Sequence, residues 1–174
     1  MKKKFFILLL SAIILSCSND DDSSNIQNGF SVNGSDYSTT YAYNRADLRS
    51  IIVSSADRTL DSYTEDRGHF EIDNSGDNLV PGIYSTNNGL FHGVVEFDKN
   101  IIKEDGNFVS LGDTLGFTCC AETGSNNFQS ASVTINSVDY NSDGRITYIN
   151  MDYTFNWEGI EIKGNYNGEV DYKP

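Results

Sequence analysis

Strict alternation of apolar and polar residues over the last third of the chain constrains the fold more than any other feature. From 149 to 157 the odd positions are Ile, Met, Tyr, Phe and Trp, and the even positions are polar. After Glu158-Gly159 the phase flips, and apolar residues alternate with polar ones from Ile160 to Tyr172. Because successive side chains of a strand point to opposite faces, the pattern predicts two half-buried strands. The two residues between them, ending in Gly, predict a hairpin.

Shorter runs of the same kind recur along the rest of the chain. Polar clusters such as 74–77 separate them, and no long stretch repeats with the helical period. We therefore expect an all-β protein, an antiparallel β-sandwich of about 8–10 strands, with an up-and-down, lipocalin-like barrel as the alternative. The runs that predict strands before the last third are 29–32, 37–43, 48–54, 69–73, 82–85, 90–97, 108–111, 115–121 and 131–138.

Aromatic residues fall mainly on the apolar faces of these runs, where core packing is their expected role. Tyr37, Tyr41 and Tyr43 share one face of a predicted strand, and core packing is favoured there over the stacking of sugar rings. Gly164 and Gly168 lie on the apolar face of the last strand. Glycines at such positions predict a bend or close packing against a large aromatic ring.

The N-terminus has the pattern of an export signal. Three lysines follow the initial Met, and residues 5–15 are almost wholly apolar. That run is too short to span a bilayer, which takes about 20 residues, and it suits the core of a signal peptide. It ends with a small residue before Cys17, which resembles the lipobox of bacterial lipoproteins. The resemblance implies that residues 1–16 are a signal peptide and that Cys17 carries the lipid, while an ordinary secretory signal is the alternative.

Residues 17–27 are predicted to form an acidic tether. The run Ser-Asn-Asp-Asp-Asp-Ser-Ser after Cys17 offers no core residue, so we expect a solvated, flexible segment. An acidic run at this place also resembles the export signal of surface-exposed lipoproteins in the Bacteroidota. That resemblance implies lipid anchoring in the outer membrane, facing outward, while a spacer on a periplasm-facing lipoprotein is the alternative. Residues 28–174 then suffice for a single β domain.

The charge of the chain restricts its partners. Asp and Glu number 25 against 12 Lys and Arg, for a net charge of −13. Removal of residues 1–16 takes away three more positive charges and no acid. Such a chain repels nucleic acid, so a nucleic-acid partner is excluded. Membrane contact is expected through the lipid on Cys17, and the sequence leaves open which protein or glycan would be a partner.

The stretch DYNSDGRI resembles part of a calcium-binding loop. Asp139, Asn141 and Asp143 stand at alternate positions, and a Gly follows, as in the first half of that pattern. A full loop ends with an acidic residue at the twelfth position, which is Asn150 here, and strands rather than helices are predicted on either side. A plain turn is therefore the favoured interpretation, because Asn, Asp and Gly suit tight turns. Calcium remains the weaker hypothesis, and no other cofactor is expected.

Other signs of chemistry are sparse. His69 and His92 would form a metal or acid–base site only if their strands met, and two exposed histidines are the favoured interpretation. The acid pairs Glu65-Asp66 and Glu104-Asp105 occur in polar stretches that we interpret as solvated loops. No nucleophile elbow, zinc-protease motif or phosphate loop is found.

The remaining cysteines, Cys119 and Cys120, are adjacent. The alternation around them predicts one buried and one exposed thiol, with diverging side chains, rather than a disulfide.

Several short motifs together resemble a known group of proteins. They are GFSVNG at 29–34, PGIY at 81–84, and ASVTI at 131–135 followed by a polar turn and two long alternating strands. In combination with the lipobox and the acidic tether they resemble small β-rich lipoproteins of the Bacteroidota that carry a domain of unknown function. The chain differs from that pattern at 147–148, where a Gly is expected. The resemblance implies an all-β fold and envelope anchoring, and it supplies no catalytic residues.

From these observations we expect a lipid-anchored cell-envelope protein whose β domain is a non-enzymatic binding or structural module. An envelope hydrolase acting on glycans is one alternative, and it would need a pair of carboxyl groups held in a cleft. A barrel that carries a small apolar ligand is another.

Overall fold

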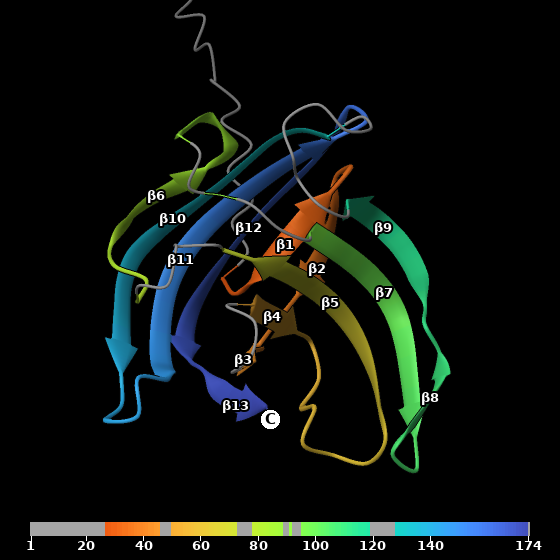
Figure 1. Cartoon of the computed structure of the whole chain (residues 1–174). Helices are drawn as coiled ribbons and strands as arrows, with labels where there is room; N and C mark the ends of the chain where they lie inside the picture. The colour runs from red at the N-terminus through yellow and green to blue at the C-terminus, as the bar shows by residue number, and fades with distance from the viewer. Residues whose placement is uncertain are drawn as a thin grey trace, which may run out of the picture.

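Two β-sheets packed face to face form the protein (Figure 1). The computed structural model describes residues 27–45, 50–72, 78–88, 91, 95–118 and 128–173. Apart from one short 3₁₀ turn at Thr86–Asn88 (η1), the regular structure in these ranges is all strand. The two sheets keep separate edges, so the antiparallel β-sandwich is confirmed over the closed, lipocalin-like alternative. None of the described segments is a helix of the length and apolarity that crossing a membrane requires.

The first sheet has six strands in the order β2-β1-β12-β11-β10-β6, all antiparallel. Its strands are β1 (Gly29–Val32), β2 (Ser35–Ser38), β6 (Gly82–Ser85), β10 (Phe128–Tyr140), β11 (Ile146–Trp157) and β12 (Ile160–Glu169). The second sheet has seven strands in the order β13-β3-β4-β5-β7-β8, with β9 also paired to β7. Its strands are β3 (Tyr41–Arg45), β4 (Ser50–Ser54), β5 (Tyr63–Glu71), β7 (Val95–Glu104), β8 (Asn107–Ser110), β9 (Asp113–Thr118) and β13 (Asp171–Lys173). Among the described strands, only the β13–β3 pair is parallel.

Two tight turns set the register of the first sheet. Glu158 and Gly159 join β11 to β12 with φ values of 48° and 79°, and Asn33 and Gly34 join β1 to β2 with 50° and 76°. Positive φ at both central residues is the conformation that favours Asn-Gly and similar pairs in hairpins. The predicted hairpin of the last third is thus confirmed, with Trp157 paired to Ile160.

The predicted strand 37–43 is divided between the sheets. The chain leaves β2 after Ser38 and enters β3 at Tyr41, so the three tyrosines do not share one face. Tyr37 stacks on Phe30 with ring centroids 4.9 Å apart, whereas Tyr43 is fully buried in the other sheet and Tyr41 is exposed. The pattern of apolar and polar residues does not reveal that the chain passes from one sheet to the other here. The sequence therefore predicted a single strand.

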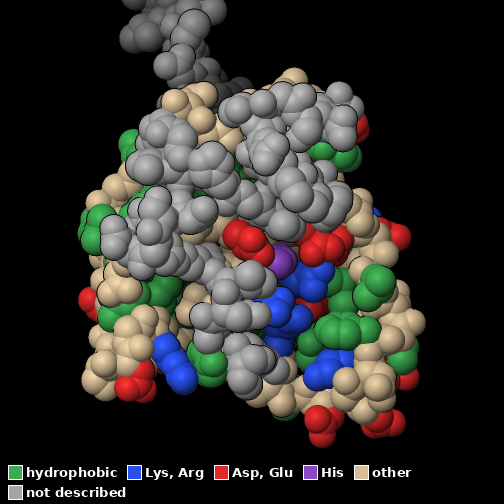
Figure 2. Space-filling view, viewed as in Figure 1, with side chains coloured by type: hydrophobic (Ala, Val, Ile, Leu, Met, Phe, Trp, Pro, Cys, Tyr) green, Lys and Arg blue, Asp and Glu red, His purple; other side chains and the backbone are tan. Residues whose placement is uncertain are grey.

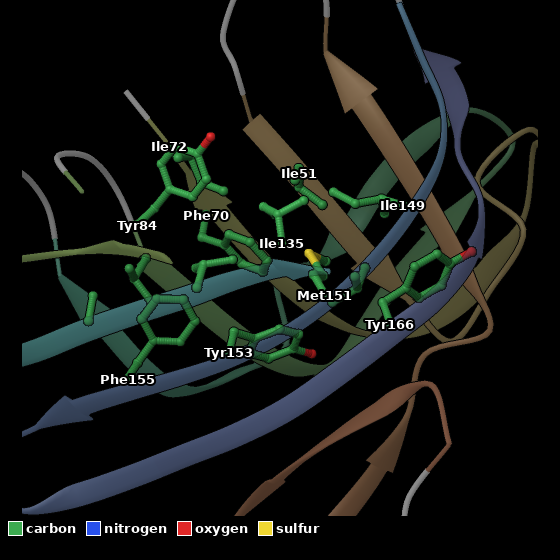
Figure 3. Packing of buried hydrophobic residues seen from close by; sticks show 14 of the residues in the cluster. Ile51, Phe70, Ile72, Tyr84, Ile135, Ile149, Met151, Tyr153, Phe155 and Tyr166 are labelled. Atoms are coloured by element: carbon green, nitrogen blue, oxygen red, sulfur yellow. The ribbon is translucent and has the colours of Figure 1, made fainter. Parts of the chain in front are cut away.

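Aromatic rings and aliphatic side chains together fill the space between the sheets (Figure 3). Phe155 of β11 lies at their centre, with its ring centroid 5.4 Å from that of Phe70 on β5 and 5.6 Å from that of Phe97 on β7. Phe91 and Tyr153 lie within 6 Å of the same ring. The core is therefore one cluster to which both sheets contribute, as expected for a sandwich.

Glycines make room for two of these rings, as predicted for Gly164. A Cβ atom added to Gly164 would lie 2.5 Å from the ring of Tyr153, its cross-strand partner. In the second sheet Gly68 faces Phe97 in the same way, also at 2.5 Å. A large ring packed over a facing glycine fills the space that the missing side chain leaves.

Candidate functional site

The candidate site lies on the face of the seven-stranded sheet that points away from the core. On β5, Gly68 and Phe70 face the core, so Arg67 and His69 point to the opposite face. Their partners on β7 point the same way, because Arg67 pairs with Asp98 and His69 pairs with Glu96. A strand that the sequence predicted only from residue 69 thus begins six residues earlier and carries the polar groups of the site.

A β-bulge in β7 brings a further cation to this face. Between Asp98 and Ile101 the strand advances three residues while β5 advances two, from Arg67 to Glu65. The extra residue reverses the alternation, so Lys103 points to the same side as Asp98. Lys103 stands between Tyr63 of β5 and Phe108 of β8 in the cross-strand register.

Two contacts hold the bulge in place. The backbone N–H of Asn100, where φ is +57°, donates a hydrogen bond of 3.0 Å to the carboxylate of Asp66. Gly112, which precedes β9, lies so close that an added Cβ would be 2.1 Å from the carbonyl oxygen of Lys99. Only glycine fits there, and its φ of +73° also favours glycine.

The loop between β4 and β5 folds over part of this face. Tyr43 of β3 is buried beneath it, and the Tyr43 hydroxyl accepts a hydrogen bond of 2.8 Å from the backbone N–H of Arg58. The loop is fixed at its far end, where the backbone N–H of Gly106 donates to the carbonyl oxygen of Asp61 at 2.8 Å. These contacts place the Arg58 guanidinium beside the site.

Together these elements enclose a pocket of about 420 Å³. Figure 2 shows basic side chains gathered below the purple histidine, acidic side chains on either side of it, and apolar side chains beside the basic ones. A volume of this size suits a small molecule. Its cationic walls are Arg45, Arg58, Arg67 and Lys103. The other lining residues are Ile52, Tyr63, His69, Glu96 and Phe108.

Arg67 is the centre of the charge network. Its Nη2 atom lies 2.7 Å from Oδ2 of Asp98 and 3.1 Å from Oε2 of Glu96. Nδ1 of His69 lies 3.8 Å from the same oxygen of Glu96. The carboxylates differ in exposure, because the side chain of Asp98 is 3% exposed and that of Glu96 is 31% exposed.

The environments of these two carboxylates shift their pKa values in opposite directions. The adjacent His69 side chain is the main cause that holds the pKa of Glu96 below its ordinary value, and Arg67 adds to the effect. Burial raises the pKa of Asp98, although Arg67 opposes that effect. The pocket therefore holds one carboxylate that is easily ionised beside one that keeps its proton more readily.

A second, deeper network surrounds Glu65. Its side chain is fully buried, accepts a hydrogen bond of 2.6 Å from the Ser54 hydroxyl, and lies 3.4 Å from Nε of Arg58. The interpretation of Glu65 as part of a solvated loop is therefore wrong, because the residue belongs to β5 and faces beneath the β4–β5 loop. Glu104, by contrast, is exposed at the end of β7.

Three buried polar atoms in and beneath the pocket have no hydrogen-bond partner among the described residues: Nε of Arg67, Nε2 of His69 and Oε1 of Glu65. Buried polar atoms are nearly always bonded, so such atoms mark places where a ligand or water completes the network. The favoured interpretation of His69 as an exposed residue is therefore also wrong, since its side chain is 13% exposed.

The residues of the predicted calcium loop lie at the turn between β10 and β11, far in the chain from the pocket residues. Oδ1 of Asn141 accepts hydrogen bonds from the backbone N–H groups of Asp143 and Arg145, both at 3.0 Å. Asp139 is the penultimate residue of β10 and pairs with Tyr148. Within the described ranges, no group of three or more His, Cys, Asp or Glu side chains is arranged to hold a metal ion. Calcium binding here stays a prediction.

Several predictions fall outside the described residues. They concern the signal peptide at 1–16, Cys17 and almost all of the tether at 17–27, His92, and the pair Cys119 and Cys120.

Few features of the sequence predicted the pocket. Its cations come from β3, β5, β7 and a loop, and none of them belongs to a motif. One signal was present, because even positions from Gly68 to Ile72 are apolar or glycine and the odd positions between them are polar.

Comparison with protein families, with curated proteins and with solved structures finds no match for this chain. The resemblance to small Bacteroidota lipoproteins therefore stays a prediction.

Proposed function

We propose that the chain is a lipid-anchored protein of the cell envelope, attached to the outer membrane through Cys17 and facing outward. Its β-sandwich acts as a non-enzymatic binding domain, and the pocket on the outer face of the seven-stranded sheet is its ligand site. The signal sequence, the cysteine and the acidic tether support the anchoring. The all-β fold supports a rigid scaffold for the site.

One observation carries the binding role: Arg67 and His69 line a small-molecule-sized pocket, and each keeps a buried polar atom that has no partner among the described residues. Leaving such an atom unsatisfied costs about 1–3 kcal/mol. A domain with only a structural role would gain stability from closing this pocket with apolar side chains. A polar pocket of this kind is instead suited to a ligand that supplies the missing partners.

The anchoring is tested by metabolic labelling with radioactive palmitate in a bacterial host that processes lipoproteins. We expect label on the wild-type chain and none on Cys17→Ser, with the wild-type chain in the outer-membrane fraction. Protease added to intact cells should degrade the wild-type chain if it faces outward. Label on the Ser variant, or a wild-type chain recovered as a soluble periplasmic protein, would contradict the proposal.

The binding role is tested on the lipoprotein extracted from its own membrane in mild detergent. Low-molecular-mass fractions of the envelope extract are added while thermal unfolding is followed. A fraction that raises the melting temperature of the wild-type chain, but not that of a Phe108→Asp variant at the pocket wall, supports a ligand site. If no fraction stabilises the wild-type chain, the domain is structural and the proposal is wrong.

The opposite pKa shifts of Glu96 and Asp98 favour a second candidate function, a hydrolase acting on glycans. Two carboxyl groups whose pKa values are pushed apart are the usual acid–base pair of such enzymes. Against this, one guanidinium nitrogen of Arg67 contacts both groups, and Asp98 is almost inaccessible to a substrate. A panel of 4-nitrophenyl glycosides tests it: turnover that Glu96→Gln abolishes would establish the enzyme, and equal background rates for both chains would exclude it for these substrates.

A further inference from the structure

Positive charge is concentrated at the pocket to a degree that the composition of the chain does not suggest. Three of the 12 Lys and Arg residues lie in the predicted signal peptide, and four of the other nine line this one pocket. Among the described residues of the lining, Glu96 is the only acidic one. The pocket is therefore a locally positive region of a chain whose net charge is −13.

The described carboxylates leave Lys103 of the pocket unpaired. Glu96 and Asp98 both contact Arg67, and Glu65 contacts Arg58. Nζ of Lys103 lies 5.3 Å from the centre of the Tyr63 ring, and among the described residues no carboxylate pairs with it. Arg67 also keeps one buried N–H, at Nε, without an acceptor among those residues. The pocket thus has spare hydrogen-bond donors and spare positive charge.

One wall of the pocket is apolar and aromatic. Phe108, at 49% exposure, and Tyr63 flank Lys103 in the cross-strand register, and Ile52 lines the pocket from β4. An exposed phenylalanine next to a lysine offers a flat surface for the body of a ligand and a charge for its acidic group.

From these features, and building on the binding role proposed above, we infer that the ligand is a small organic acid: a carboxylate or phosphate group on a compact, ring-sized body. The acidic group lies between the Lys103 ammonium and the Arg67 guanidinium, which both line the pocket. The body of the ligand packs on Phe108 and Tyr63. Glu96 is an internal competitor, because its carboxylate already occupies one donor of Arg67.

Other ligand classes fit less well. A metal cation would be repelled by four cationic side chains, and a long polyanion such as nucleic acid would be repelled by the acidic remainder of the chain. A purely apolar ligand would cover the Lys103 ammonium without giving it a polar partner.

The test is calorimetric titration of the detergent-solubilised lipoprotein with acids and their neutral counterparts. Glucuronate, glucose 6-phosphate and benzoate are the probes, and glucuronamide, glucose and benzamide are the matched controls. We expect at least one acid to bind about tenfold more tightly than its counterpart, which corresponds to one charge-assisted hydrogen bond. The affinity for glucuronate compared with that for glucose 6-phosphate shows whether the pocket prefers a carboxylate or a phosphate. The affinity for glucuronate compared with that for benzoate shows whether it prefers a sugar ring or an aromatic ring.

Variants at the pocket show where the acid binds. Lys103→Gln should weaken binding about tenfold while Lys103→Arg keeps it, because the arginine retains the charge. Glu96→Gln should tighten binding, since it removes the competing carboxylate. Lys103 is half-buried and pairs with no described acid, so these variants are expected to fold. An Arg67 variant is avoided because it would leave Asp98 buried without its cation.

The outcomes separate this inference from the proposed function. If acids and neutral counterparts bind equally and Lys103→Gln has no effect, the pocket binds ligands but the inference of an organic acid is wrong. If none of the six compounds binds while an envelope fraction still stabilises the chain through the pocket, the inference is again overturned and the binding role stands. If no envelope fraction stabilises the chain either, both are wrong.

Discussion

At the scale of single residues, Asn141 determines the conformation of the turn that resembles a calcium loop. Its side-chain oxygen accepts two backbone hydrogen bonds. Loss of both in Asn141→Ala should lower the free energy of unfolding by about 1 kcal/mol. Asp143→Ala removes only a surface carboxylate and should change it by less than about 0.5 kcal/mol. Urea denaturation of the two variants measures this difference, and equal effects would mean that the Asn141 bonds do not hold the turn.

The same two variants decide between a turn and a metal site. If the stretch is only a turn, calcium at millimolar concentration leaves the melting temperature of the wild-type chain unchanged. A rise in melting temperature that Asp143→Ala abolishes would instead establish Asp139, Asn141 and Asp143 as calcium ligands.

Buried tyrosines predict a loss of stability in alkali. Burial raises the pKa of Tyr43 and of Tyr166 to about 12, and it raises that of Tyr153 further. The unfolded chain releases these protons near pH 10. Their stabilisation is therefore complete below pH 10 and is lost as the pH rises from there. At pH 11 we expect a loss of about 1 kcal/mol for each of Tyr43 and Tyr166.

Absorbance of tyrosinate measures this effect alongside urea denaturation at pH 8, 10 and 11. The buried tyrosines should ionise only as the protein unfolds, after the exposed ones. A Tyr166→Phe variant, which cannot ionise at that position, should lose less stability between pH 10 and 11 than the wild-type chain. Complete ionisation of all tyrosines near pH 10, with the fold intact, would contradict the pKa shifts.

At the scale of elements, the bulge in β7 is the feature that builds the pocket. Without the extra residue between Asp98 and Ile101, Lys103 would point toward the opposite face. Gly112 stabilises the bulge by its close approach to the backbone of Lys99. The pocket therefore depends on backbone geometry at least as much as on its side chains.

Gly112→Ala tests this dependence, and Gly106→Ala is its control. Both glycines have positive φ, at 73° and 80°, so both variants incur a backbone cost of about 1–2 kcal/mol. Only at Gly112 would the new Cβ also clash with backbone, whereas nothing lies within 4 Å at Gly106. We expect Gly112→Ala to lower the free energy of unfolding by about 3 kcal/mol in total. This variant should also bind the organic acids, glucuronate, glucose 6-phosphate or benzoate, more weakly than Gly106→Ala does. If the two variants lose equal free energy of unfolding, the backbone at the bulge can move away from the new Cβ, and the prediction is wrong.

The long strands of the first sheet were predictable from the sequence because one of their faces is buried and the other is solvated. Ile149 to Trp157 alternates for that reason. The second sheet was harder, since residues such as Arg67 and Glu65 lie on an outer face that a loop and a charge network partly cover. There the outward positions carry buried charges, so the stretch from 63 to 68 resembles a polar loop. The pocket could not be predicted, because its members meet only through cross-strand register and a bulge.

At the scale of the whole molecule, the aromatic cluster around Phe155 joins the two sheets. The ring contacts Phe70 and Phe97 of the opposite sheet and Tyr153 of its own. Neither sheet buries its inner face without the other, so we expect the domain to unfold as one cooperative unit. The pocket on the outer face of the second sheet would then depend on the core beneath it.

Phe155→Ala should therefore destabilise the whole molecule by about 3–5 kcal/mol, the usual cost of removing a buried aromatic ring. That is a large part of the 5–15 kcal/mol typical of a domain. Phe108→Ala is the control, because Phe108 is half exposed at the pocket wall and should cost less than about 1 kcal/mol. Urea denaturation followed by far-UV circular dichroism and by the fluorescence of Trp157 in the first sheet should give coincident transitions for both variants. Separate transitions in Phe155→Ala, with Trp157 reporting one and the remaining strands another, would show that the sheets fold independently and that the core does not support the pocket.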